Sequence, residues 1–389
     1  MRIEAPQRQK KCTPGRRASV KLIALFLMAF LSLASHAQDY MRFPARGKVP
    51  AGYPAEYAAT ITAAENEANL VIYSTTDLSV ARNLIEDFQT LYPRIEVEYH
   101  DLNSTVLHYR FQSEMRLGQS SADIVWSSAM DQQFSLVDQG FAQGYASPET
   151  AALPAWVVWQ NLAFGTSFEP VAIVFNKRLL AENLVPRTHA DLLRLLNSRA
   201  AEFTRRIVTY DIEKSGLGFL LASQDATASP EFWDVARALG KVEARFDLTS
   251  EGMIKSVVSG RNILAYNALG SYALKAAATE PAIGVVFPAD YTLVMSRIAF
   301  ISSKARNPNA ARLWIDYLLS RRGQTLLANQ AGLHSVRGDI EGPYTASTLK
   351  TQLGASIRPI PVAPGLVADL AEPRYRDFIR RWRQATSRK

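Results

Sequence analysis

Five polar turns carry the side chains with which this chain is best equipped to bind a small molecule. Each follows a short apolar segment, and their letters read STTD, SS, YD, YN and DY, at residues 74–77, 127–128, 210–211, 266–267 and 290–291. Backbone N–H groups at a helix N-terminus, with Ser and Thr hydroxyls beside them, form a ready anion site. Helix capping is the simpler interpretation of any one turn, whereas five such turns favour a shared polar cleft.

Hydroxyl-bearing residues and glycines in and near these turns are the candidate donors to a bound anion, because glycine lets the backbone approach closely. The candidate donors are Ser74, Thr75, Thr76, Ser127, Ser128, Ser215, Gly216, Gly270 and Ser271. Asp211 suits a hydroxyl group of the solute, and Asn267 and Asp290 belong to the same expected site. For Asp77, capping of its own helix is the simpler interpretation.

Tyrosines and one arginine complete the expected site. Four tyrosines could close over a ligand, with half-buried packing as the alternative for each: Tyr210, Tyr266, Tyr272 and Tyr291. Arg297 could neutralise an anion by bidentate bonding, and an inter-strand salt bridge is its alternative. No Lys or Arg lies within the donor turns themselves, which is compatible with anion capture by helix dipoles.

Motifs for catalysis are missing from the sequence. There is no G-x-S-x-G elbow, no H-E-x-x-H and no P-loop, and no spacing singles out an acid–base pair. We therefore expect a binding protein rather than an enzyme, with no cofactor and no metal site. A hydrolase is the minority alternative.

Strand-like and helix-like segments alternate along the chain, which predicts an α/β fold. LVIY at 70–73 precedes a segment whose apolar residues recur at helical spacing until Pro93. Similar strand-like runs end at residues 126, 210 and 266. We expect largely parallel sheets, in which ligands bind outside the carboxyl ends of the strands, and the polar turns stand at those ends.

Residues 1–37 show the three-part pattern of a secretory signal peptide. Seven basic side chains and one acid precede an uncharged apolar run from Leu22 to Ala34, and small residues surround the site before Gln38. The run is shorter than the roughly 20 residues that a membrane-spanning helix needs. We expect cleavage and a soluble mature protein, with a membrane anchor as the alternative.

The charge balance changes when this segment is removed. The whole chain has 44 basic and 36 acidic side chains, and 37 and 35 remain without residues 1–37, so a net charge of +8 becomes +2. No nucleic-acid partner is therefore expected. The only cysteine, Cys12, lies in the removed segment, which leaves no disulfide or thiol chemistry. The remaining length suits two domains.

Longer motifs resemble an extracellular solute-binding family that includes ferric-ion-binding proteins and binders of phosphorylated metabolites. NLVIYSTTD, DFQTLYPRIEVEYHDLNS and SADIVWSSAMDQQ resemble its opening. VTYDIEKSGLGF, LAYNALGSYAL, FPADYTLVMSRIA and NPNAARLWIDYLLSRRGQ resemble later segments, so the likeness covers roughly residues 68–340. The resemblance implies a two-lobed type II periplasmic-binding-protein fold with two hinge crossovers, near 168–175 and 286–294. It also implies a periplasmic protein that serves the membrane permease of an ABC transporter.

The expected domain boundaries follow from this resemblance. They are a signal peptide at 1–37, an N-terminal extension at 38–67, the first part of lobe 1 at 68–170, lobe 2 at 171–288, and the second part of lobe 1 with C-terminal helices at 289–389. The basic run from Arg374 to Arg388 is expected to be the solvated face of a last helix. We expect a monomer.

The expected ligand depends on which branch of the family the chain resembles. The iron binders of the family hold ferric ion with two adjacent tyrosines, whereas no two tyrosines are adjacent in this chain. The mature protein has four histidines, and none falls in a turn assigned to the cleft. The YNALGSYA segment resembles the hexose-phosphate and phosphoglycerate binders. We therefore expect a small anionic solute, either a sugar phosphate or a phosphoglycerate.

Two alternatives to uptake of an organic anion stay open. One is ferric-ion capture for iron uptake. The other is a sensory role, in which the liganded protein contacts a membrane histidine kinase rather than, or besides, a permease. The extension at 38–67 and the basic C-terminal tail could serve such a contact.

Overall fold

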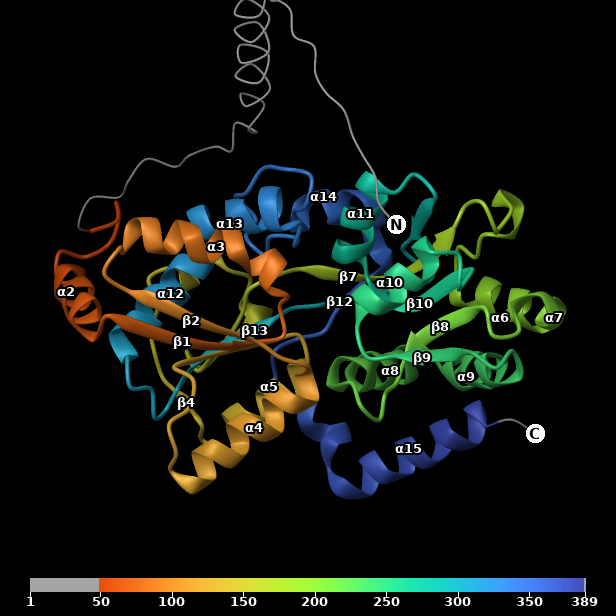
Figure 1. The fold of residues 1–389 in the computed structure, drawn as a ribbon, viewed down its shortest axis with the longest axis horizontal. Helices are drawn as coiled ribbons and strands as arrows, with labels where there is room; N and C mark the ends of the chain where they lie inside the picture. Colours follow the sequence, from red (N-terminus) through yellow and green to blue (C-terminus); the bar gives the residue numbers. More distant parts are fainter. Residues whose placement is uncertain (1–48, 388–389) are drawn as a thin grey trace, which may run out of the picture. The chain divides into compact units, whose positions relative to one another are not determined.

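Two mixed β-sheets form the framework of residues 49–387, the part of the chain that the computed structural model describes (Figure 1). Each sheet has seven strands and its own set of helices. The expected two-lobed α/β architecture is therefore confirmed. The signal peptide expected at residues 1–37 and the first part of the extension lie outside the described residues. No helix within residues 49–387 is long and apolar enough to cross a membrane.

The first sheet brings together strands from both halves of the chain. In spatial order its strands are β2 (Glu96–Asp101), β1 (Asn69–Ser74), β3 (Ile124–Ser127), β13 (Ile298–Ser302), β6 (Ala163–Gly165) and β5 (Val158–Trp159), with β4 (Ala142–Gln143) beside β13. Its helices are α2 (Tyr57–Glu67), α3 (Leu78–Leu91), α4 (Ser104–Leu117), α5 (Met130–Asp138), α12 (Pro308–Leu319) and α13 (Arg321–Leu326). We call this half lobe 1.

The second sheet has the same kind of organisation. Its strands in spatial order are β14 (Ile357–Pro359), β12 (Thr292–Met295), β7 (Glu169–Asn176), β10 (Leu264–Leu269), β8 (Ile207–Tyr210) and β9 (Arg245–Asp247), with β11 (Ile283–Val286) beside β7. Its helices are α6 (His189–Ser198), α7 (Ala200–Phe203), α8 (Gly216–Ala228), α9 (Phe232–Lys241), α10 (Ser250–Val258), α11 (Gly270–Thr279) and α15 (Glu372–Thr386). We call this half lobe 2. A further helix, α14 (Ala346–Leu353), packs beside the passage between the sheets.

Short links join the two lobes directly. The chain passes from β6 to β7 through residues 166–168 and from β12 to β13 through residues 296–297. The first link runs from lobe 1 to lobe 2, and the second link runs back from lobe 2 to lobe 1. Accordingly, β13 is antiparallel to β3 and β6, and β7 is antiparallel to β10 and β12. The sheets are therefore mixed rather than largely parallel as we expected.

Apolar spacing explains why the helices of lobe 1 form where they do. In α3 the residues at helical spacing, including Ala81, Leu84 and Phe88, are buried, and the helix ends at Leu91 before Pro93. In α4 the side chain of Asn103 accepts a hydrogen bond from the backbone N–H of Thr105 and caps the first turn. Gly118 ends that helix at φ +68°, a conformation that glycine adopts without steric cost.

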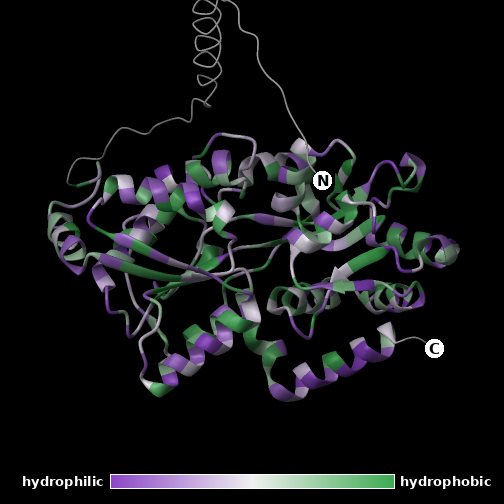
Figure 2. Ribbon diagram, viewed as in Figure 1, coloured by the Kyte–Doolittle hydropathy of each residue, from purple (hydrophilic) through white to green (hydrophobic). Residues whose placement is uncertain are grey.

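The segment after residue 289 does not belong to lobe 1 alone, contrary to our expectation. Strands β12 and β14 pair within the second sheet, and α15 packs on α9. The reason is an aromatic stripe on α15, where Phe378 lies 4.9 Å from Trp233 and Trp382 stacks on Phe232, between ring centroids. Figure 2 shows this helix with alternating hydrophobic and hydrophilic bands. Its basic residues are largely exposed, and Arg381 stacks over Trp233.

Candidate functional site

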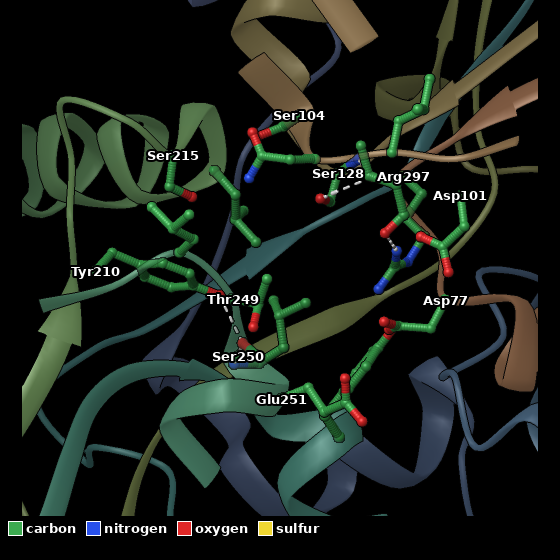
Figure 3. Close-up of a pocket in the computed structure, with 17 residues that line it drawn as sticks. Asp77, Asp101, Ser104, Ser128, Tyr210, Ser215, Thr249, Ser250, Glu251 and Arg297 are labelled. Carbon is green, nitrogen blue, oxygen red and sulfur yellow. Dashed lines mark hydrogen bonds between the residues drawn. The ribbon is translucent and has the colours of Figure 1, made fainter. Parts of the chain in front are cut away.

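A cavity of about 130 Å³ lies between the two lobes. Apart from Arg297, which lies in the link after β12, its lining comes from residues near the carboxyl ends of six strands: β1, β2 and β3 in lobe 1, and β8, β9 and β10 in lobe 2. Each of these strands runs parallel to a neighbour, so the rule that ligands bind beyond the carboxyl ends of such strands holds in both lobes. Figure 3 shows the side chains that surround this space.

Six of the residues expected from the sequence line this cavity. They are Thr75, Ser128, Tyr210, Ser215, Tyr272 and Arg297. The hydroxyl oxygens of Thr75 and Ser128 lie 3.1 Å apart and share a hydrogen bond across the turns after β1 and β3. Across the cavity, the hydroxyl oxygens of Tyr210 and Ser250 lie 2.6 Å apart. Burial raises the pKa of Tyr210, so its phenol stays protonated.

Three expected donors of lobe 1 do not line the cavity but support the turns that do. The hydroxyl of Ser74 accepts from the backbone N–H of Thr76, and that of Ser127 accepts from Ala129. The hydroxyl of Thr76 accepts a hydrogen bond from Arg297 at 2.9 Å. Ser74 and Ser127 therefore close local turns and do not cap helices, because α3 and α5 begin only after Asp77 and Ala129.

Four expected residues of lobe 2 likewise do not line the cavity but contact residues next to it. Asp211 pairs with Lys214 and accepts the backbone N–H of Glu213, which shapes the turn before α8. Gly216 donates its N–H to Ser104, and its Cα faces Gln132, where an added Cβ would lie 2.2 Å from the amide oxygen. Gly270 packs against Phe287 in the same way. The hydroxyl of Ser271 lies 3.0 Å from Nδ1 of His334, whose pKa burial lowers to about 4.

Tyr266 and Asn267 point away from the cavity, into a buried network around Asp225. Both donate hydrogen bonds to Oδ2 of Asp225, at 2.7 and 2.6 Å. We expected a turn to begin at Asn267, but β10 continues to Leu269 through a bulge between Ala265 and Ala268. Asn267 adopts φ +63° at this bulge, so two consecutive side chains face the same side of the strand. Burial raises the pKa of Asp225.

Asp290 also lies away from the cavity. Strands β11 and β12 both pair with β7, so residues 287–291 loop out sideways between two segments of one sheet edge and do not reach its carboxyl end. There Asp290 accepts from the backbone N–H of His189 at 2.9 Å and lies within 3.0 Å of its Nδ1. The ring of His189 stacks on Tyr291 at 4.1 Å.

Sequence reasoning missed two of the turns that form the cavity. The turn after β2 contributes Asp101, Leu102, Asn103 and Ser104, and the turn after β9 contributes Leu248, Thr249, Ser250 and Glu251. The first follows a strand-like run and opens a helix, so the rule applied to the other turns would have found it. The second follows β9, which has three residues and two exposed side chains, so no apolar pattern marks that strand.

Carboxylates dominate the charge at one end of the cavity. Asp77, Asp101 and Glu251 lie there, and Figure 3 shows them on one side of the space with Arg297. Burial raises the pKa of Asp101, and the negative charges of Asp77 and Glu251 raise it further. Tyr272 donates its hydroxyl proton to Asp77 and so fixes that carboxylate against the second lobe.

Arg297 is the cationic residue of the lining, and it is already engaged. Its Nε and Nη2 donate to the two carboxylate oxygens of Glu169 at 2.7 and 3.2 Å, and both side chains are buried. Its Nη1 donates to Thr76. Burial opposes the charge of the guanidinium, but Glu169 more than compensates and raises the pKa of Arg297. The salt bridge weighed for this residue is therefore present, and bidentate bonding to an anion stays a prediction.

Direct hydrogen bonds join the lobes around the cavity. Ser104 of lobe 1 accepts the backbone N–H of Gly216 at 3.0 Å, and the hydroxyl of Thr105 donates to the carbonyl of Lys214 at 2.9 Å. The contact between Tyr272 and Asp77 is a third bond between the lobes. Residues 49–387 contain no group of three or more His, Cys, Asp or Glu side chains that could hold a metal ion.

Comparisons with known proteins agree with this arrangement. The model of a family described as bacterial extracellular solute-binding protein matches residues 74–325. The substrate-binding protein of an ABC transporter from Agrobacterium tumefaciens is 38% identical, with a TM-score of 0.78 over 82% of this chain and 94% of that one. No curated protein matches the chain.

Two more distant structures share the fold. The periplasmic binding protein AfuA from Actinobacillus pleuropneumoniae, solved with fructose-6-phosphate, has a TM-score of 0.68 at 17% identity, over 82% of this chain and 98% of that one. The apo ferric ion-binding protein A of Pasteurella haemolytica has a TM-score of 0.65 at 16% identity, with the same coverage. The expected type II periplasmic-binding-protein fold is thereby confirmed. With two lobes, a lined interlobe cavity and a matching family model over most of its length, the chain belongs to the family of bacterial extracellular solute-binding proteins.

Proposed function

We propose that this protein captures a small polar organic solute in the periplasm and delivers it to the permease of an ABC transporter. The observation that carries the proposal is the interlobe cavity, to which the carboxyl ends of three strands from each lobe contribute hydrogen-bonding side chains. The 38% identical relative from Agrobacterium tumefaciens, which is described as the substrate-binding protein of an ABC transporter, supports the partnership with a permease.

Lobe closure supplies the mechanism. The links at 166–168 and 296–297 are short and can act as hinges, so one lobe can swing relative to the other. A solute favours the form in which the lobes touch only if both lobes contact it. Thr75 and Ser128 of lobe 1 and Tyr210 and Ser215 of lobe 2 meet that condition. The bonds from Ser104 and Thr105 to lobe 2 would then hold the form that docks on the permease.

The lining suits a hydroxylated solute more readily than a strongly anionic one. The hydroxyl groups of Thr75, Ser128 and Ser215 can donate a hydrogen bond to a solute hydroxyl or accept one from it. The carboxylates of the lining can accept hydrogen bonds from the same kind of group. A phosphorylated solute stays a prediction from the sequence resemblance. It would have to rely on hydroxyls and helix N-termini, because the arginine of the lining is paired and three carboxylates face the same space.

A test of the proposed function compares the mature protein with a variant whose cavity is filled. Thermal unfolding is measured with a panel of sugars, sugar phosphates, phosphoglycerate, amines, polycarboxylates and ferric salts. A solute that binds the folded protein raises its unfolding temperature by mass action. In Ser128→Trp the indole occupies the cavity, so we expect the stabilisation to disappear while circular dichroism still shows a folded protein. Equal stabilisation of both proteins would place the solute elsewhere and refute the proposed site.

Ferric salts in the same panel test the alternative of iron capture. If ferric ion alone stabilises the protein and a tyrosinate charge-transfer colour develops, uptake of an organic solute is refuted. We expect neither effect.

A further inference from the structure

We infer that the solute held in the interlobe cavity is a small organic cation, whose charged group lies beside Asp77, Asp101 and Glu251. This inference rests on the proposed function, because it takes the interlobe cavity as the solute site. It assigns the chemical class of the ligand as an amine or guanidine that carries oxygen atoms at its other end.

The charged side chains of the lining give the first argument. They are three carboxylates and one guanidinium, a formal balance of −2. The guanidinium of Arg297 is balanced by Glu169 before any solute arrives, since both carboxylate oxygens accept its protons. Lys255 lies 2.8 Å from Glu251 and offsets the charge of that carboxylate, which leaves Asp77 and Asp101 without a cationic partner of their own within residues 49–387. An entering solute therefore meets a negative potential.

The position of the carboxylates on both lobes gives the second argument. Asp77 and Asp101 belong to lobe 1, whereas Glu251 lies in the first turn of α10 in lobe 2. The three charges are close enough that Asp77 and Glu251 both raise the pKa of Asp101. Like charges brought together when the lobes meet repel each other, and a cation between them turns that repulsion into attraction. The charge of the solute would therefore itself favour lobe closure.

The opposite end of the cavity provides an independent observation about the ligand. The hydroxyls of Ser104 and Ser215 line the cavity there, and the two residues are only 5% and 2% exposed. Each accepts one backbone N–H, from Gly216 and Gly218. Within residues 49–387 neither hydroxyl proton has an acceptor. A buried donor without an acceptor is costly, so these hydroxyls are matched by oxygen atoms of a solute.

The size of the cation follows from the spread of the carboxylates. Across the described part of the chain no three acids, histidines or cysteines converge into a coordination sphere. The carboxylates thus surround a space rather than a point. An ammonium or guanidinium group, which distributes several N–H donors around a larger volume, fits such a space better than a bare metal ion does.

Matched solutes test the charge directly. Isothermal titration calorimetry of the mature protein, freed of bound solute by mild unfolding and refolding, compares glucosamine with glucose and glucose 6-phosphate, and 4-amino-1-butanol and 4-guanidino-1-butanol with 1,4-butanediol. We expect at least one amine or guanidine to bind, and its uncharged or phosphorylated counterpart to bind at least tenfold more weakly. In Glu251→Gln the affinity for that cation should fall by tenfold or more. The control Glu202→Gln, an exposed acid on α7, should bind like the wild type.

The outcomes separate this inference from the proposed function. If a neutral or phosphorylated solute of the panel binds tightly and Glu251→Gln leaves its affinity unchanged, the inference of a cationic ligand is refuted. The proposed uptake function stands in that case. If the amine binds equally to the variant Ser128→Trp with the filled cavity, the solute site itself is refuted.

If no solute of the panel binds, a second measurement tests whether the carboxylates of the two lobes repel each other. Small-angle X-ray scattering of the solute-free protein compares the wild type with the double variant Asp101→Asn, Glu251→Gln. Removal of the repulsion should let the lobes approach, so the radius of gyration of the variant should be smaller. An unchanged or larger radius would overturn the inference.

Discussion

The guanidinium of Arg297 connects the solute site to the passage between the lobes. Arg297 lies in the link between β12 and β13, and its partner Glu169 begins β7 just after the other link. Glu169 also accepts a hydrogen bond from Ser167, and the backbone N–H of Arg297 donates to the same hydroxyl at 3.0 Å. One buried ion pair therefore ties together both segments that join the lobes.

Replacement of this arginine should destabilise the whole fold. In Arg297→Met the carboxylate of Glu169 stays buried without a cationic partner, and breaking a buried pair in this way typically costs about 3–5 kcal/mol. The free energy of unfolding in urea measures the loss. The control Arg199→Met removes an exposed partner of Glu202 and should change stability by less than about 0.5 kcal/mol. A loss below about 1 kcal/mol for Arg297→Met would contradict this assignment.

At the scale of single residues, the sequence predicted the kinds of side chain in the site better than it predicted which residues line the cavity. Thr75, Ser128, Tyr210 and Ser215 line the cavity because they follow strands whose ends were placed correctly. Tyr266 and Asn267 do not, because a bulge carries β10 on to Leu269. A bulge depends on pairing with a distant strand, so local apolar patterns do not reveal it.

A buried carboxyl group in helix α5 makes the stability of the fold depend on pH. In the first turn of α5, burial raises the pKa of Asp131 to about 7, and its Oδ2 is buried without a hydrogen-bond partner. Residues Pro364–Leu370, which follow β14 along the chain, pack against this helix. Because the folded-state pKa exceeds the ordinary value of an aspartate, the protonated form favours the folded state.

The stability contribution of Asp131 should therefore depend on pH with a defined sign. It is fully present below about pH 4 and is lost as the pH rises through about 7. Asp131→Asn keeps the oxygen that accepts the backbone N–H of Gln132 and removes the ionisation. Relative to the wild type, the variant should gain roughly 2–4 kcal/mol between pH 5 and pH 8, measured by urea unfolding at both values. The exposed control Asp377→Asn should gain nothing, and an equal result for both variants would refute the shift.

The docking of α15 offers another prediction at this scale. A Cβ added to Gly240 in α9 would lie 2.4 Å from the carbonyl oxygen of Ala385 and 2.8 Å from Cα of Thr386. Backbone atoms cannot yield as a flexible side chain does, so Gly240→Ala should displace the end of α15. We expect a loss of about 1–3 kcal/mol and faster amide hydrogen exchange in α15. Gly338→Ala, which meets nothing within 4 Å, should leave exchange in α15 unchanged, and unchanged exchange in both would contradict the packing.

Most elements could be predicted from periodicity, and the exceptions share one cause. Helices α3, α4 and α10 begin and end close to the expected residues because apolar spacing, capping residues and glycines mark them. Strand β9 has three residues with two exposed side chains, so its position depends only on pairing with β8. Thr249 and Glu251 were missed for that reason.

At the scale of the whole molecule, the two lobes are joined by the links from β6 to β7 and from β12 to β13. The sequence predicted α/β layers and two crossovers, but the antiparallel strands and the place of α15 on lobe 2 depend on long-range contacts. The extension at 38–67 is likewise part of the fold in its described portion. Its helix α2 packs on α12, where Tyr57 donates to the buried Asp316 at 2.6 Å.

The most direct test of the central claim is native mass spectrometry of protein purified from its own cell envelope. It compares the wild type with Ser128→Trp, in which the indole fills the cavity between the lobes. We predict that the wild type carries a small organic solute as a noncovalent mass increment and that the folded variant carries none. The same solute on both proteins would contradict the claim that it is held between the two lobes.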